Sequence, residues 1–171
     1  MRTIGRRPLL SAAAVLAAAG CAVLATGPAV AKTSHAGWPK IDGLTIIHKL
    51  DQTAPMTGLK DKHNELLGGH GDDTIVAGRI GDVLWGDYKP SGQPTTQTDT
   101  IRGGAGKDFI YASHGRNIIS TGGGADQIHA HFGRGSITCA SSKATVFLSH
   151  KSKPHYKLHG CPRISFKSVG H

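Results

Sequence analysis

The sequence has 171 residues and a formal net charge of +9, with 24 glycines and only 5% aromatic residues. A chain so poor in large apolar side chains cannot rely on a hydrophobic core alone to offset the ordering entropy of its backbone, so something else must help to hold the fold. The motifs H-E-x-x-H, G-x-S-x-G and C-x-x-C do not occur. Their absence excludes a motif-based assignment as a zinc peptidase, serine hydrolase or dithiol oxidoreductase, and we expect no enzymatic activity.

Residues 1–31 have the pattern of a secretory signal peptide. Three arginines among the first seven residues precede an apolar stretch rich in alanine, and "AVA" ends at Ala31 with a small-x-small cleavage site. A membrane anchor would need a longer apolar run of about 20 residues, and lipidation of Cys21 is an alternative that the sequence leaves open. We expect a secreted, extracellular mature chain of about 140 residues, which is one domain by length.

A nine-residue period runs through the middle of the chain. In "GGHGDDTIV" (68–76) the sixth position is acidic and the eighth is aliphatic, and both features recur in "AGRIGDVLW", "GGAGKDFIY" and "TGGGADQIH". The eighth position stays aliphatic in four further units, "LKDKHNELL", "ASHGRNIIS", "AHFGRGSIT" and "CASSKATVF". The unit that begins at Gly86 carries eight extra residues in the inserted loop 87–98, whose prolines and glycine mark it as a loop and whose role the sequence does not reveal.

Each unit combines a glycine-rich turn with three or four β-prone residues, which are too few to stand alone as a strand. Two units form a coil, and stacked coils pair their strands in parallel around a thin core made by the eighth positions. The predicted fold is all-β, a parallel β-roll (β-solenoid) of nine-residue repeats with N- and C-terminal caps. Its predicted parts are the N-terminal cap segment 32–58, the roll 59–147 and the basic C-terminal cap 148–171.

The sixth positions of alternate units stack on opposite edges of such a roll. Neighbours on one edge lie roughly 4.8 Å apart, so like charges there repel unless a cation neutralises them. One edge carries Asn64, Asp82, Asp108, Asp126 and Ala144, and the other carries Asp73, Asp99, Asn117 and Gly135. Carboxylate oxygens and the carbonyls of glycine turns form an oxygen shell that suits Ca²⁺ and not zinc, so we expect calcium ions that stabilise the fold.

The units "GGHGDDTIV", "GGAGKDFIY" and "TGGGADQIH" resemble the G-G-x-G-x-D-x-U-x nonapeptide of RTX (haemolysin-type) calcium-binding β-rolls, over about residues 59–147. The chain ends look like those of short secreted actinobacterial calcium-binding proteins of this type. The resemblance implies side-chain and carbonyl ligands at Asp73, Asp82, Asp99, Asp108, Asp126, Asn117, Gly69, Gly71, Gly104, Gly106, Gly122 and Gly124. Asp108 with Asp126 is the strongest predicted pair, and the coils of Gly135 and Ala144 are predicted to lack calcium.

Two cysteines, Cys139 and Cys161, remain after removal of the signal peptide. In an oxidising compartment the default expectation is a disulfide between them, with two free thiols as the alternative. The segments "TVFL" and "RISF" are expected to form strands that close the C-terminal end of the roll, tied by the disulfide.

Two further features leave alternatives open. No Asp or Glu follows Asp126, whereas seven Lys and Arg residues do, so the C-terminal part could bind an anionic cell-envelope polymer; nucleic acid is a weaker candidate, and a solvated basic face is the simpler interpretation. His70, His114 and His131 lie toward the edge that carries the insertion. A small secreted hydrolase or adhesin that uses this edge is the alternative to a calcium-binding protein, and solvent-facing turn histidines are the simpler interpretation.

Overall fold

The computed structural model describes residues 37–88, 92 and 94–168. The predicted signal peptide, residues 1–31, lies outside this part of the chain. Within the described residues, no helix has the length and apolar character that crossing a membrane requires.

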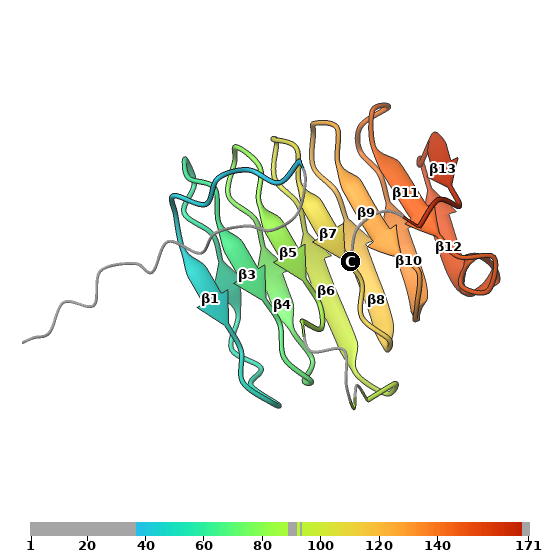
Figure 1. Ribbon diagram of the computed structural model, residues 1–171, viewed down its shortest axis with the longest axis horizontal. Coiled ribbons are helices and arrows are strands. Elements are labelled where there is room, and N and C mark those ends of the chain that lie inside the picture. The colour runs from blue at the N-terminus through green and yellow to red at the C-terminus, as the bar shows by residue number, and fades with distance from the viewer. Residues whose placement is uncertain (1–36, 89–91, 93, 169–171) are drawn as a thin grey trace, which may run out of the picture.

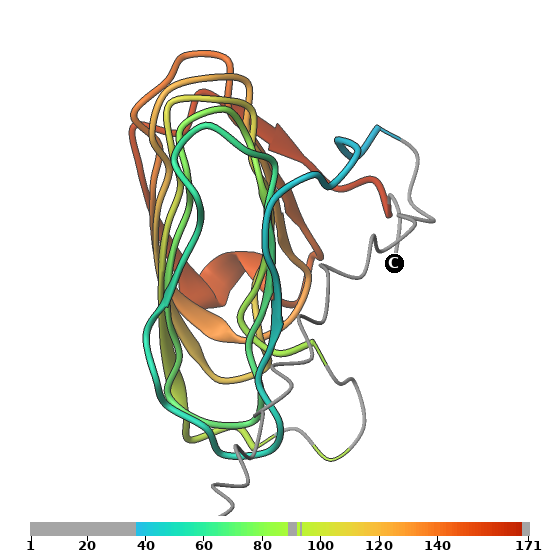
Figure 2. The same ribbon diagram turned by 90° about the vertical axis from the view of Figure 1, so that its left-hand side faces the viewer.

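Two parallel sheets face each other and form a flattened coil that repeats along one axis (Figures 1 and 2). The first sheet has the order β1 (Thr45–Ile47), β3 (Glu65–Leu67), β5 (Val83–Trp85), β7 (Phe109–Tyr111), β9 (Gln127–Ala130), β11 (Thr145–Leu148) and β13 (Arg163–Ser165). The second sheet has the order β2 (Met56–Thr57), β4 (Thr74–Val76), β6 (Thr98–Arg102), β8 (Arg116–Ser120), β10 (Arg134–Thr138) and β12 (Tyr156–His159). The chain alternates between the sheets, which confirms the predicted all-β parallel β-roll.

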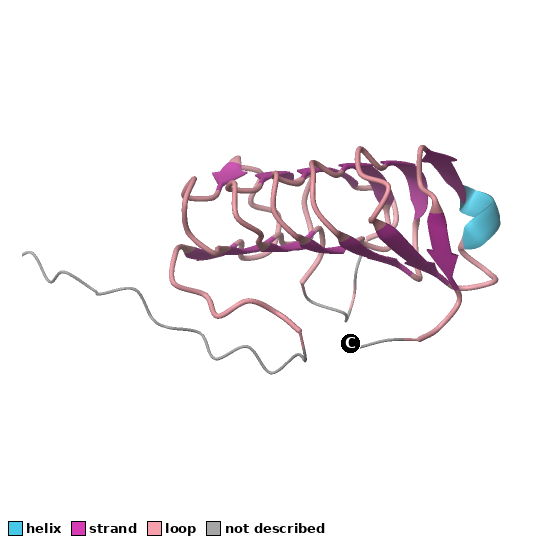
Figure 3. Ribbon diagram, turned by 90° about the horizontal axis from the view of Figure 1, so that it is seen from above, coloured by secondary structure: helices cyan, strands magenta, loops and turns pink. Residues whose placement is uncertain are grey.

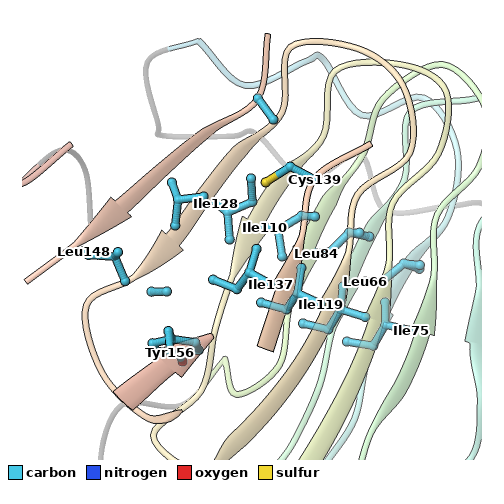
Figure 4. Close-up of a cluster of buried hydrophobic side chains, with 14 of the residues drawn as sticks. Leu66, Ile75, Leu84, Ile110, Ile119, Ile128, Ile137, Cys139, Leu148 and Tyr156 are labelled. Carbon is cyan, nitrogen blue, oxygen red and sulfur yellow. The ribbon is translucent and has the colours of Figure 1, made fainter. Parts of the chain in front are cut away.

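The core is a single line of aliphatic side chains between the two sheets (Figure 4). The strand pairing stacks each eighth position on the eighth position of the next coil, for example Leu84 on Ile110 and Ile101 on Ile119. The stacked residues, all at most 1% exposed, are Leu66, Ile75, Leu84, Ile101, Ile110, Ile119, Ile128, Ile137 and Val146. One side chain per half-coil is a narrow core, so the hydrogen bonds and charges of the turns carry more of the stability than in a domain with a wide core.

Strands also form in the two segments expected to be caps. β1 and β2 pair with β3 and β4, and β12 and β13 pair with β10 and β11, all in parallel. These segments therefore contribute coils of the roll as well as its ends. The expected disulfide joins Cys139 to Cys161, and the predicted closing strands, β11 and β13, lie side by side.

A row of flat rings runs along the outer face of the first sheet at the ninth position of successive units. Trp85 stacks on Tyr111 with ring centroids 4.1 Å apart, and Tyr111 stacks on His129 at 4.5 Å. Trp38 covers the start of this row and donates a 2.9 Å hydrogen bond from Nε1 to the Tyr111 hydroxyl. The two tryptophans are thus packing residues that fix the N-terminal segment against the sheet.

Candidate metal sites at the stacked turns

The parallel register places the sixth positions of alternate units in two columns, one along each edge of the roll. We call them the Asp82 column and the Asp99 column, after a central member of each. The Asp82 column consists of Asn64, Asp82, Asp108, Asp126 and Ala144, and the Asp99 column of Asp73, Asp99, Asn117 and Gly135. All of the acidic members are at most 1% exposed.

Each carboxylate of the Asp82 column binds the backbone of the coil before it. Oδ1 of Asp82 accepts a hydrogen bond from the N–H of Asn64 at 2.5 Å, Oδ1 of Asp108 accepts one from Asp82 at 2.8 Å, and Oδ1 of Asp126 accepts one from Asp108 at 3.0 Å. In the Asp99 column, the N–H of Asp73 donates to Oδ1 of Asp99 in the same way. Charge-assisted bonds of this kind join successive coils at their edges.

The second carboxylate oxygen closes the turn that precedes the aspartate. Oδ2 of Asp108 accepts a 2.6 Å hydrogen bond from the N–H of Gly104, and Oδ2 of Asp82 accepts one from Gly78 at 2.5 Å. The turns of successive coils stack so closely that a Cβ on Gly122 would clash with the carbonyl oxygen of Gly104. Glycine is therefore required there, and the turn carbonyls of one coil are brought directly against the next.

The two asparagines of the columns donate hydrogen bonds to the carbonyl oxygens of their own turns. Nδ2 of Asn117 donates to the carbonyl oxygens of Ser113 at 3.1 Å and Gly115 at 3.4 Å, the residues four and two positions before it. Nδ2 of Asn64 makes similar bonds in its own turn, to the carbonyl oxygens of Leu59 at 3.0 Å and Lys62 at 2.9 Å, five and two positions before it. An asparagine thus supplies a donor to the turn, whereas an aspartate at the same position supplies only further acceptors.

The turns before the aspartates hold carbonyls at the same offsets and no such amide donor. The residues four and two positions before Asp73, Asp108 and Asp126 are Gly69, Gly71, Gly104, Gly106, Gly122 and Gly124. These are the glycines that the resemblance predicts as carbonyl ligands. Carbonyl and ionised carboxylate oxygens together form an all-oxygen ligand set, which fits a hard cation.

Two carboxylate oxygens in the columns have no partner among the described residues. Oδ2 of Asp99 and Oδ2 of Asp126 are buried and accept no hydrogen bond there. A buried acceptor without a donor is costly, and more so when it carries charge. The two atoms, one on each edge, are therefore buried acceptors that fit the ligand set of a hard cation.

Burial raises the pKa values of carboxyl groups in both columns. Burial is the largest cause for Asp108, whose pKa rises to about 7, and the charges of Asp126 and Asp82 add to it against the opposing hydrogen bonds. Burial likewise raises the pKa of Asp99 to about 6, with a further contribution from Asp73. Carboxylates held this way are costly as anions without a cation beside them.

Asp87 is a buried acid that the sequence reasoning missed. It lies in the inserted loop, and burial first, then the charges of Asp99 and Asp73, raise its pKa to about 8. Its Oδ2 accepts a hydrogen bond from Nε2 of Gln97, at the other end of the loop. Asp87 stands outside the nine-residue frame, so only the unusual Gly-Asp pair after a strand could have drawn attention to it.

The Asp99 column ends on a histidine at its N-terminal side. Nδ1 of His48 lies 2.6 Å from Oδ1 of Asp73, and both side chains are buried. His48 occupies the place where a preceding coil would supply a backbone N–H to the carboxylate. No periodic signal precedes β1, so the sequence did not indicate this contact.

The three histidines singled out in the sequence do not form one site. His114 and His131 line the same cavity at the C-terminal part of the roll, whereas His70 does not line it. Among the residues that the structure describes, no group of three or more His, Cys, Asp or Glu side chains is arranged to hold a metal ion. Any cation on the columns must therefore be held largely by backbone carbonyls, as the glycine turns suggest.

Stacked parallel coils joined by glycine turns, with a buried carboxylate after each turn, define a β-roll of nonapeptide repeats. The family model of the RTX calcium-binding nonapeptide repeat matches the chain in four copies, over residues 61–84 and 95–128. These coils are RTX repeats, which confirms the resemblance seen in the sequence. The comparison with curated proteins gives no match, and neither does the comparison with solved structures.

Proposed function

We propose that this protein is a secreted calcium-binding β-roll in which Ca²⁺ is held between stacked turns and its binding is coupled to folding. The observation that supports the proposal is the presence of both asparagine and aspartate at the equivalent positions of the columns. Where Asn64 and Asn117 stand, an amide donates to the turn carbonyls, and where aspartates stand an ionised side chain has no hydrogen to donate to them. The RTX repeats in the same coils support calcium as the cation.

The ligands would come from both chain segments that meet at an edge. On the Asp82 column, Asp108 and Asp126 would supply carboxylate oxygens and the turns at 103–107 and 121–125 would supply carbonyls. Asp82 would contribute to the neighbouring site on this edge. On the Asp99 column, Asp73 and Asp99 would act with the turn at 68–72, and Asp87 is an additional acid close to them.

Coupling to folding follows from the cost of the calcium-free state. The line of aliphatic residues is thin, and several buried carboxylates lie next to one another without full compensation. When bound, calcium supplies the positive charge that lets these groups ionise in place, and a ligand that binds only the folded state stabilises it. We assign no catalytic role to the columns.

The decisive experiment is calorimetric titration with Ca²⁺, together with circular dichroism of calcium-loaded and chelated protein. We expect saturable binding and a melting temperature that rises by about 10 °C or more with calcium. Asp108→Asn and Asp126→Asn should each remove calcium affinity, while the matched change Asp61→Asn at an exposed surface ion pair should not. Unchanged β-structure and melting temperature after chelation would refute the proposal.

Secretion is tested separately from binding. Expression of the full chain in a host with a general secretory pathway should place the protein in the medium with an N-terminus at Lys32. Retention of residues 1–31 would contradict the signal-peptide assignment and leave the calcium sites unaffected.

A further inference from the structure

A cavity of about 640 Å³ lies at the C-terminal part of the roll, on the edge of the Asp99 column. Three successive connections form its walls: the β7–β8 turn, the β9–β10 turn, and the longer β11–β12 connection, whose short helix η1 (Lys153–His155) ends the row of coils in Figure 3. The C-terminal tail adds Phe166. The volume is in the range of small-molecule sites, and none of the predicted calcium ligands lines it.

Two stacked pairs of rings give the cavity flat walls. His114 stacks on Phe132 with centroids 4.5 Å apart, and His150 stacks on Phe166 with centroids 4.4 Å apart and planes within 3° of parallel. Phe132 and Phe166 remain about half exposed, at 50% and 47%. Stacking holds each pair in place while about half of each phenylalanine side chain stays exposed.

The ionisable side chains that line the cavity are all basic. They are His114, His131, His150, Lys151 and His155, and no carboxylate is among the described residues that line the cavity. The chain contains no Asp or Glu after Asp126, so the β9–β10 turn, the β11–β12 connection and the tail supply no acidic side chain. A cavity of this kind attracts an anion.

The wall formed by the β11–β12 connection is fixed by hydrogen bonds to the coil beneath it. The hydroxyl of Ser149 donates to the carbonyl of His131 at 2.8 Å, and the hydroxyl of Ser152 donates to the carbonyl of Ala130 at 2.7 Å. The N–H of Ser152 donates in turn to Oγ of Ser149. Lys151 projects from this fixed segment, so the cavity is formed before any ligand arrives.

We propose that this cavity binds a small aromatic anion, with its ring against Phe132 and Phe166 and its carboxylate, sulfonate or phosphate group beside Lys151 and the histidines. The site is distinct from the carboxylate columns and does not depend on which cation they hold. Its chemistry is the reverse of theirs: basic, aromatic and without carboxylates.

The test uses 8-anilinonaphthalene-1-sulfonate as the anionic probe and N-phenyl-1-naphthylamine as its neutral counterpart, both followed by fluorescence. The protein is the folded chain with calcium in excess. We expect the sulfonate to bind saturably at one site, with an affinity that falls as the salt concentration rises, because salt screens the charges of the lining. The affinity of the neutral probe should show no such fall.

Variants localise the binding. Lys151→Met should weaken the sulfonate at least about 5-fold and leave the neutral probe unchanged, because the substitution keeps the apolar stem and removes the charge. Phe132→Ala should weaken both probes. Lys157→Met, at an exposed lysine of β12 that does not line the cavity, is the matched control and should change neither.

Three results would overturn the proposal: no saturable sulfonate binding, binding that Lys151→Met and Phe132→Ala leave unchanged, or equal salt dependence of the two probes. A melting curve of each variant with calcium establishes that it is folded. Phe166→Leu is a second aromatic variant in the exposed tail, and it should weaken both probes if Phe132→Ala fails to fold. The calcium titration is run on the same variants, so failure of this site and failure of the calcium sites are distinguishable.

Discussion

Nδ2 of Asn117 lies 3.1 Å from the hydroxyl of Tyr156, two coils further along the Asp99 column. Gly135 stands between them, and any Cβ there would clash with the carbonyl of Asn117. The tyrosine hydroxyl also donates to the carbonyl of Phe132 at 2.8 Å. The column therefore ends on a neutral hydrogen-bonded group, and the missing carboxylate of this coil is replaced by a phenol from the next.

Tyr156→Phe tests this end of the column. The change leaves Nδ2 of Asn117 and the carbonyl of Phe132 each without one buried partner, which should lower the free energy of unfolding by about 1–3 kcal/mol. Urea denaturation with calcium in excess measures the loss. The calcium stoichiometry should not change, since no predicted ligand is removed; a loss of bound calcium would show that this end takes part in a site.

Asn117→Asp exchanges an amide donor for an acceptor at a position that is fully buried. Without calcium the change should cost roughly 3 kcal/mol, because a buried carboxylate then faces turn carbonyls with no compensating charge. With calcium in excess much of this loss should be recovered. Thermal melts of the variant with and without chelator measure both effects.

The control for that variant is Ser120→Asp, which adds the same charge at an exposed position of β8. Its melting temperature should change little in either condition. If Asn117→Asp lowered the melting temperature of calcium-free protein as little as Ser120→Asp does, our inference that the Asn117 amide takes the place of a cation would be wrong.

Stability without calcium should fall as the pH rises. The folded-state pKa values of Asp99, Asp108 and Asp87, about 6, 7 and 8, lie above the ordinary value of 3.8, so the folded protein retains protons that the unfolded chain releases. This contribution is fully present below pH 3.8 and is lost as the pH passes through the folded values. From pH 5.5 to 8.5 the melting temperature of chelated protein should drop by about 5 °C or more.

Calorimetry with a chelator that binds well across this pH range measures the effect. With calcium in excess the drop should be absent or reversed, because ionised carboxylates bind the cation more strongly. Asp87→Asn should reduce the pH dependence of the chelated protein. A melting temperature that rises from pH 5.5 to 8.5 without calcium would contradict the raised pKa values.

Loss of the disulfide should destabilise the C-terminal coils. The bond between Cys139 and Cys161 closes a loop with a sequence separation of 22, and its removal should cost about 3 kcal/mol in the chain-entropy model. The double variant Cys139→Ala/Cys161→Ser, compared in urea with the oxidised protein, measures this. Calcium affinity should be retained because the predicted ligands all precede Cys139, and a reductant should have no further effect on the variant.

The sequence predicted the repeating part of the roll well because its period determines both register and burial. An aliphatic residue at every eighth position fixes which side chains face inward, and the spacing of Asp82, Asp108 and Asp126 then fixes one column. The nine-residue period does not predict which groups the carboxylate oxygens point toward. Their bonds to backbone N–H groups of the preceding coil and to the glycine turns depend on the geometry of stacked turns.

Contacts made outside the repeats escaped sequence reasoning for a different reason. Three residues reach the Asp99 column from outside the repeats. His48 directly follows β1, Asp87 lies in the inserted loop, and Tyr156 begins β12 directly after the short helix. None of these segments follows the nine-residue frame, so no spacing relates them to the column. Such residues become visible only when the path of the chain between coils is known.

The hydrogen bonds that the carboxylates of the Asp82 column make between coils all point one way: the later coil in the chain provides the carboxylate acceptor, and the earlier coil provides the N–H. The first and last coils of this edge therefore differ in the hydrogen-bond partners that they need. A chain emerging from a ribosome or a membrane channel with its N-terminus first exposes unsatisfied donors on its newest coil until the following one arrives. Completion of the edge thus depends on the last coils, and shortening the protein from its C-terminus should harm it more than shortening it by the same length from its N-terminus.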